Sequence, residues 1–235
     1  MQLFYNSQIT ESDEQFTFNK IESKHIVRVL RKSEGDILNI TNGNGFLFSA
    51  KISIANDKKC IVNIIDSVKK TKPWHYNLHI AIAPTKNNDR FEWFLEKATE
   101  VGIDEITPII CDRSERKFLK LERMQKIIES AAKQSLKYHF PKLNEPSKFD
   151  DFIKAHSSGK LFIAHCEELE KESLQSQCRT EGKITILIGP EGDFTPNEIN
   201  KATAKDYLAI TLGESRLRTE TAGIIATHTI SLVNN

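Results

Sequence analysis

The stretch ITILIGPEGDF, residues 184–194, joins a short apolar run to a loop that contains two glycines and a proline. A continuous apolar run of this length is typical of a strand buried on both faces of a parallel sheet. Gly189 and Gly192 leave room for backbone to approach a ligand closely, and Pro190 stiffens the loop between them. Ligands of open α/β sheets bind at the carboxyl ends of the strands. The stretch therefore predicts a ligand site there, with an ordinary strand-to-helix turn as the alternative.

Strand and helix patterns alternate on both sides of this stretch, from residue 73 onward. Helix patterns cover 88–102, 121–138 and 219–233, and Thr195-Pro196-Asn197-Glu198 predicts a capping box that opens another helix. The alternation predicts a parallel sheet covered by helices on both faces. Apolar runs predict its strands at 78–84, 106–110, 161–166, 184–189 and 207–213.

The first 72 residues follow a different pattern, in which short apolar runs alternate with turn residues, as in DILNI, TNGNG and FLFSAKISI. Asn-Gly supplies the positive backbone angles that tight hairpins require. A helical turn or two around Lys24 to Arg31 interrupts the strands. The charged stretch KKTKPW, residues 69–74, then marks a boundary. We expect a small β-barrel over 1–72 and an α/β domain over 73–235.

Composition excludes several classes of protein. The chain has 235 residues, of which 39% are hydrophobic and 28% charged, so it is not largely disordered. No apolar run reaches the roughly 18 residues that span a bilayer, and the first residues lack a signal-peptide layout. We therefore expect a cytoplasmic protein with no membrane partner.

Cysteine and histidine spacing gives no sign of a metal site. The four cysteines lack a Cys-x-x-Cys pair, which favours reduced thiols over a zinc ribbon or a disulfide framework. His75 and His79 have metal-like spacing, but no third ligand is near. We expect no metal. The cysteines are Cys60, Cys111, Cys166 and Cys178.

Charge is balanced over the whole chain but not along it. The formal net charge is +1, which does not indicate a nucleic-acid partner by itself. Residues 113–142, however, carry nine basic and three acidic side chains. This local excess could bind the phosphates of a polyanion, and a solvated helix face is the alternative.

A second polar loop, LGESRLRTETA at 212–222, follows the last predicted strand and leads into the last helix. Arg216 and Arg218 can bind phosphate or carboxylate through forked hydrogen bonds. Thr219 and Glu220 can either cap the helix or bind a ligand. Because this loop and the first one lie at the same sheet edge, they would form one pocket. Neither G-x-G-x-x-G nor a phosphate-binding P-loop motif occurs, which makes nucleoside triphosphate chemistry a poor fit.

Three runs in this order, DRFEWFLEKATEVGI (89–103), ILIGPEGDFTPNEI (186–199) and LGESRLRTETA (212–222), resemble the RsmE family of 16S ribosomal RNA uridine-N3 methyltransferases. The N-terminal HIVRVLRKSEGDILNITNGNG (25–45) is similar to that family's small PUA-like RNA-binding barrel. The resemblance implies a SPOUT-type parallel sheet with a C-terminal deep trefoil knot. It also implies S-adenosylmethionine as cofactor, 16S rRNA in the small ribosomal subunit as partner, and a homodimer.

The resemblance also implies which residues form the site. Three loops would bind the cofactor, mostly through backbone groups: Ala164, His165, Cys166, Glu167, Ile188, Gly189, Pro190, Glu191, Gly192, Leu212, Gly213, Ser215, Leu217, Arg218 and Thr219. Uracil N3 must lose a proton, so Arg218 is our candidate for stabilising the uracil anion and Glu220 for orientation or proton transfer. Candidate RNA contacts are His25, Arg28, Arg31, Lys32, Arg113, Arg116, Lys117, Arg123, Lys133 and Lys137. Asp193 stands where many relatives have a second glycine, GPEGG.

Three other functions stay open at this stage. A methyltransferase with the same fold could act on another RNA base or on a ribose 2'-OH, and its pocket loops would look alike. A non-catalytic RNA-binding or ribosome-assembly protein would keep the fold without the chemistry. A structural oligomer without an RNA role would leave both the barrel and the loops unexplained.

Overall fold

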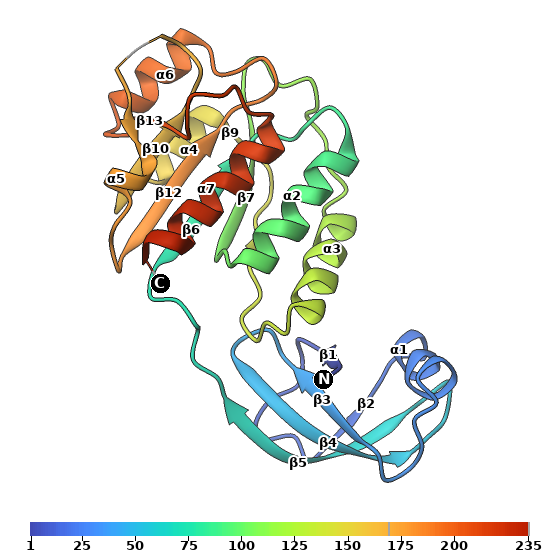
Figure 1. Ribbon diagram of the computed structural model, residues 1–235. Coiled ribbons are helices and arrows are strands. Elements are labelled where there is room, and N and C mark those ends of the chain that lie inside the picture. The colour runs from blue at the N-terminus through green and yellow to red at the C-terminus, as the bar shows by residue number, and fades with distance from the viewer. Residues whose placement is uncertain (169, 235) are drawn as a thin grey trace. The chain divides into compact units, whose positions relative to one another are not determined.

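The computed structural model describes residues 1–168 and 170–234 (Figure 1). The chain divides into two compact units. One unit comprises Met1–Lys72 and Ala132–Phe140, and the other comprises Pro73–Ala131 and Pro141–Asn235. None of the helices in the described ranges is long and apolar enough to cross a membrane.

The larger unit is built on an eight-stranded sheet with the order β11-β13-β10-β12-β6-β7-β8, and β9 pairs with β7 outside this path. Every pair in it is parallel. The predicted α/β architecture with a parallel sheet is thus confirmed. The strands are β6 (Asn77–Ile82), β7 (Glu105–Ile110), β8 (Lys142–Leu143), β9 (Ser147–Lys148), β10 (Lys160–Ala164), β11 (Glu172–Ser173), β12 (Lys183–Ile188) and β13 (Leu208–Thr211).

Helices cover both faces of this sheet (Figure 1). Buried residues of α2 and α7 pack in one cluster with β6 and β12, and α4 and α6 contribute to a second cluster on the other face. The helices are α2 (Asn88–Val101), α3 (Leu121–Gln134), α4 (Phe149–Ala155), α5 (Leu174–Gln177), α6 (Pro196–Thr203) and α7 (Thr219–Asn234). The helix expected to reach residue 138 ends at Gln134, and Leu136 has a left-handed backbone with φ of 54°.

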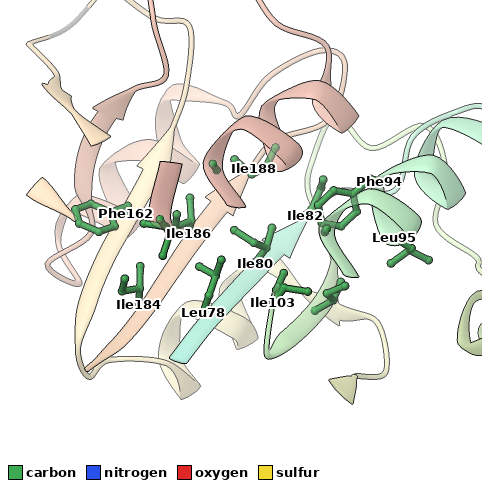
Figure 2. Packing of buried hydrophobic residues seen from close by; sticks show 14 of the residues in the cluster. Leu78, Ile80, Ile82, Phe94, Leu95, Ile103, Phe162, Ile184, Ile186 and Ile188 are labelled. Atoms are coloured by element: carbon green, nitrogen blue, oxygen red, sulfur yellow. The ribbon is translucent and has the colours of Figure 1, made fainter. Parts of the chain in front are cut away.

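Alternate residues of the central strands enter opposite cores, because side chains of a strand point to its two faces in turn. Leu78, Ile80 and Ile82 of β6 belong to the cluster beneath α2 and α7, and Figure 2 shows them beside Ile184 and other residues of that cluster. Ala81 and Ala83 lie in the other cluster. Each large apolar side chain buried this way contributes roughly 1.5–3 kcal/mol.

Local signals set the start of α6, as the sequence predicts, and both ends of α2. Thr195 and Glu198 form the capping box of α6. Asn87 caps the start of α2 by accepting from the amide of Asp89, and Gly102, with φ of 123°, ends that helix. A Cβ atom at Gly102 would lie 3.0 Å from the ring of Trp74, so the position favours glycine for space as well as conformation.

The smaller unit contains a five-stranded sheet in the order β1-β3-β4-β5-β2. Gly43 and Gly45, with φ of 75° and 92°, supply the positive backbone angles predicted for the β3–β4 connection. α1 (Lys20–Lys24) continues into a π-helical turn (His25–Val29), where helical turns were expected. The strands are β1 (Leu3–Tyr5), β2 (Gln15–Thr17), β3 (Ile37–Thr41), β4 (Phe46–Ile54) and β5 (Ile61–Lys69).

Residues 132–140 belong with the smaller unit, whereas the sequence pattern placed them in the α/β domain. The reason lies in backbone pairing with the β3–β4 connection. The amide of Gly45 donates to Tyr138 O at 2.8 Å, and the amide of Phe140 donates to Gly43 O at 2.9 Å. The ring of Phe140 also stacks on Tyr5 at 4.5 Å. Contacts made by a segment distant in sequence cannot be inferred from local pattern.

His79 of β6 is a buried ionisable group at the amino edge of the larger sheet, 1% exposed. Its Nε2 lies 2.7 Å from Thr107 Oγ1, and its Nδ1 lies 3.6 Å from Glu105 Oε2. Burial lowers the pKa of His79 to about 4, although the Glu105 carboxylate opposes the shift. The ring is therefore neutral in the folded protein at neutral pH.

We expect His79 to make the larger unit acid-sensitive. Above pH 6.5 the His79 ring is neutral in both the folded and the unfolded protein, so protonation of His79 does not lower the stability of the fold. As the pH falls from 6.5 toward 4, the ring takes up a proton in the unfolded protein but not in the folded one, which favours unfolding. The free energy of unfolding should drop by about 2–3 kcal/mol across this window. In His79→Gln, which keeps a polar amide beside Thr107, the free energy of unfolding should not show this part of the drop. Urea titrations followed by fluorescence of Trp74 and Trp93, both in this unit, measure the difference, and equal losses in the two proteins would contradict it.

Candidate ligand site at the carboxyl edge of the sheet

The carboxyl ends of β10, β12 and β13 bring three loops together at one sheet edge. Two cavities of about 360 and 270 Å³ open there. The first lies between the loop after β10 and the loop after β13, and the second between the GPEGDF loop and residues 216–219. The two cavities share lining residues and so adjoin one another. The shared residues are Ala164, Cys166, Arg216, Leu217 and Ala222.

Nearly all the residues that we predicted to bind a cofactor line these cavities. Glu167 and Gly192 do not line either of them. Gly213 has φ of 131°, and a Cβ atom at this position would meet no other atom within 4 Å, so the loop leaves open space there. The lining residues among the predicted set are Ala164, His165, Cys166, Ile188, Gly189, Pro190, Glu191, Leu212, Gly213, Ser215, Leu217, Arg218 and Thr219.

Asp193 ties the loop after β12 to the loop after β10. Its Oδ2 accepts from the amide of Cys166 at 2.7 Å, and its Oδ1 accepts from the amide of Phe194 at 2.8 Å. The residue has φ of 62°, a left-handed conformation in which aspartate is tolerated more readily than most side chains. The two hydrogen bonds offset that conformational cost. The sequence marks Asp193 only as an aspartate where many relatives have glycine, and it does not predict the hydrogen bond to the loop after β10.

Arg113 and Arg116, both expected to contact RNA, hold backbone loops of their own chain. Arg113 donates to Gly192 O at 2.9 Å, on the GPEGDF loop. Arg116 donates through Nε to the carbonyls of Thr85 and Lys86, each at 3.1 Å. The segment after β7 thus anchors two of the loops at the carboxyl edge. Local charge gave no signal for this role, because the acceptors are backbone carbonyls distant in sequence.

Two further hydrogen bonds join the GPEGDF loop to its surroundings. Glu191 Oε1 accepts from the amide of Lys86 at 2.8 Å. Thr219 Oγ1, at the start of α7, donates to Gly189 O at 3.0 Å. The loop is therefore fixed from the β6–α2 loop, from the segment after β7 and from α7. These hydrogen bonds restrain the loop that forms one wall of the second cavity.

His165 presents unsatisfied polar atoms at the first cavity. The residue is 7% exposed, and neither of its ring nitrogens has a hydrogen-bond partner among the described residues. Burial, with the neighbouring Lys171 ammonium, lowers the pKa of His165. A neutral imidazole offers one donor and one acceptor. Buried polar groups without a partner are rare in native proteins, so a ligand with both kinds of group would fit here.

The two candidate catalytic residues differ in exposure. Arg218 is exposed and lines the second cavity. Glu220, in the first turn of α7, is 5% exposed and lines neither cavity. Its Oε1 lies 3.8 Å from Arg90 Nε, and its Oε2 is buried without a hydrogen-bond partner in the described part of the chain. The Glu220 side chain therefore has unused hydrogen-bonding capacity at the start of α7.

The other predicted RNA contacts are scattered over both units. In the smaller unit His25 and Arg31 are exposed, Lys32 is half-buried, and Arg28 pairs with Asp57 at 2.9 Å. Lys133 pairs with Glu22 at 3.4 Å within that unit, and burial lowers the pKa of Lys137. In the larger unit Arg123 lies 2.6 Å from Glu92, whereas Lys117 is exposed on the loop before α3.

No cluster of metal ligands occurs in residues 1–168 and 170–234. The cysteines are free, and only Cys166, at the cavities, is exposed. Burial raises the pKa values of the Cys60, Cys111 and Cys178 thiols. These three buried thiols are therefore protonated at neutral pH and poor metal ligands.

Comparison with known proteins finds two family models, which match the N-terminal part and the larger part of the chain. An RNA methyltransferase domain model matches residues 72–231, and an RNA methyltransferase PUA domain model matches residues 19–65. The ribosomal RNA small subunit methyltransferase E of Buchnera aphidicola (Acyrthosiphon pisum) is 30% identical over 90% of this chain and 86% of its own length.

Two solved structures cover almost the whole chain. A probable rRNA-methyltransferase of Porphyromonas gingivalis is 39% identical, with a TM-score of 0.92 over 100% of this chain and 98% of that one. A Legionella pneumophila protein described as a methyltransferase, in complex with the bound cofactor SAM, is 26% identical, with a TM-score of 0.86 over 98% and 96% of the two chains.

The anchoring role of Arg113 predicts a local change in loop stability. Arg113→Ala should increase amide hydrogen exchange in residues 189–194 roughly fivefold, because about 1 kcal/mol of charge-assisted hydrogen bonding is lost. Lys117→Ala, an exposed cation of the same segment, is the matched control and should leave the exchange unchanged. Equal exchange in wild type and Arg113→Ala would show that the hydrogen bond does not order the loop.

Proposed function

Since this chain belongs to the RNA methyltransferase family, and within it to the ribosomal RNA small subunit methyltransferases E, we propose that it methylates 16S ribosomal RNA. The methyl donor is S-adenosylmethionine and the target atom is N3 of a uridine. The observation that carries the proposal is the adjoining pair of cavities at the carboxyl edge, formed by the family's three loops and containing the unsatisfied ring of His165.

The cavities suit S-adenosylmethionine in size and chemistry. Their volumes, about 360 and 270 Å³, fall in or near the range of ordinary cofactor pockets. The loops after β10, β12 and β13 offer backbone donors and acceptors, and the neutral His165 ring offers one of each. The cofactor supplies, when bound, a methyl group on a sulfonium. Transfer of that group to nitrogen is a displacement in which the protein contributes placement and charge.

The chain's own residues must then manage the uracil proton. N3 of uracil carries a weakly acidic proton that leaves before or during attack. Glu220, buried next to the cavity-lining Thr219 and with an unpartnered Oε2, orients the uracil or takes up this proton, and Arg90 at 3.8 Å limits the cost of burying the Glu220 carboxylate. Arg218, on the cavity wall, stabilises the negative charge that develops on the uracil oxygens.

RNA recognition is assigned to the smaller unit and to part of the larger one. The PUA-domain match to residues 19–65 supports RNA contacts by His25, Arg28, Arg31 and Lys32. Lys117 remains a direct candidate in the larger unit. Arg113 and Arg116 contribute to RNA methylation through the loops that they hold.

We further propose a role for each domain, an assembly and a chain topology. RNA binding is assigned to residues 1–72 and methyl transfer to 73–235, in a homodimer with a C-terminal deep trefoil knot. The knot is supported by the course of the last segment: β13 pairs with β10, while α7 packs on β6 and β12 beyond it. The segment 212–218 therefore crosses the sheet edge between them, and Thr219 bonds the GPEGDF loop there.

Methyl transfer to ribosomal subunits tests the proposed reaction. Small subunits from cells that lack this protein are incubated with it and with labelled S-adenosylmethionine, and the modified nucleoside is identified by mass. We expect N3-methyluridine. Another methylated base or a 2'-O-methyl ribose would keep the enzyme class and move the target. Cofactor binding without transfer to free RNA or to assembled subunits would favour a non-catalytic RNA-binding protein.

Substitutions at the two candidate catalytic residues test the proposed chemistry. Glu220→Gln should lower kcat by roughly 100-fold or more, because the proton acceptor is lost. Arg218→Ala should lower kcat by roughly 100-fold, with a smaller rise in the Kd for S-adenosylmethionine. Glu181→Gln and Arg179→Ala, two exposed residues before β12, are the matched controls. Unchanged kcat in a folded Glu220→Gln or Arg218→Ala protein would remove that residue from the mechanism.

A further inference from the structure

Phe118 lies on the segment between β7 and α3, and its side chain is exposed to solvent. Its side chain is 74% exposed, whereas the next residue, Leu119, is 6% exposed and belongs to the core beneath α2 and α7. On its other side Arg116 donates to the carbonyls of Thr85 and Lys86. The backbone on both sides of Phe118 is thus anchored, so its ring is presented outward by a fixed segment.

Basic residues flank Phe118 along the chain. Residues 115–126 contain five basic and two acidic side chains. A cavity of about 500 Å³ on this segment is lined by Phe118, Leu119 and Leu121, by Lys120, Lys126 and Arg123, and by Glu122. Lys117, Lys120 and Lys126 are exposed. Single exposed apolar side chains are common on proteins, but an exposed aromatic ring on a segment with three exposed lysines matches the surface that single-stranded nucleic acid uses.

The same segment is physically tied to the candidate ligand site. Arg113, five residues before Phe118, donates to Gly192 O on the GPEGDF loop, and Arg116 holds the loop after β6. The aromatic ring therefore stands on the segment that anchors the loops where methyl transfer is proposed. An RNA strand bound to this segment would be held at a fixed position relative to those loops, because Arg113 and Arg116 connect the segment to them.

We propose that Phe118, with Lys117, Lys120 and Lys126, forms a platform for an unpaired stretch of the RNA substrate. A base of that stretch stacks on the Phe118 ring, and the lysines bind the phosphates on either side. A double helix would not fit, since its bases are stacked on each other and hidden from the ring. This inference rests on the proposed function and adds a contact to it; it assigns no role in the chemical step.

Binding of RNA probes to the full-length protein tests the platform. The probes are a fluorescent single-stranded oligouridine of about ten nucleotides and a duplex of the same length, and anisotropy gives Kd at several salt concentrations. Phe118→Ala should weaken binding of the single strand roughly tenfold to a hundredfold, and Phe118→Tyr should restore it. Duplex binding should change less than twofold. The salt slope should fall in a Lys120→Ala, Lys126→Ala double variant and stay unchanged in Phe118→Ala.

Control measurements separate this inference from the proposed function. Leu208→Ala, an exposed apolar side chain at the amino end of β13, should bind both probes as wild type does. Wild-type methyl transfer together with unchanged single-strand binding by Phe118→Ala would overturn the platform alone. A sedimentation mass that falls in Phe118→Ala, with RNA binding intact, would also overturn it and make this surface an interface between copies. Absent methyl transfer by wild type would instead overturn the proposed function.

Discussion

Parallel pairing of β12 with β10 on one side and β6 on the other is the constraint on which the rest of the larger unit depends. Side chains of β12 are buried on both faces of the sheet. A shift of its pairing register by one residue would therefore move each side chain into the core on the opposite face. The strand ends at Ile188, and the loop begins at Gly189. Because the neighbouring strands run in the same direction, their loops emerge at the same edge.

Hydrogen bonds between loops then convert this edge into a shaped cavity. Asp193 joins the loops after β10 and β12, Arg113 holds the GPEGDF loop from outside, and Thr219 holds it from α7. In these hydrogen bonds a side chain binds the backbone of another loop. Other backbone groups of the loops and the His165 ring then remain free to bind a ligand. A site of this kind places its reactants by rigidity, which is what displacement at a methyl group requires.

Much of this arrangement could be predicted from local sequence, and the remainder could not for physical reasons. Apolar runs and caps predicted the central strands and α6, because burial and helix ends leave periodic or short-range signals. The roles of Arg113 and Arg116 were not predicted, since a guanidinium that binds a carbonyl looks in sequence like one that binds phosphate. The pairing of residues 138–140 with the β3–β4 connection also lacks a local signal.

The central claim is that the three loops at the carboxyl edge together bind S-adenosylmethionine. Amide hydrogen exchange of the whole protein, measured with and without the cofactor, tests it most directly. We predict slower exchange in all three segments, 164–167, 188–194 and 211–219, with little change at the amino edge around His79. Protection confined to other segments, or absent at saturating cofactor, would contradict the claim.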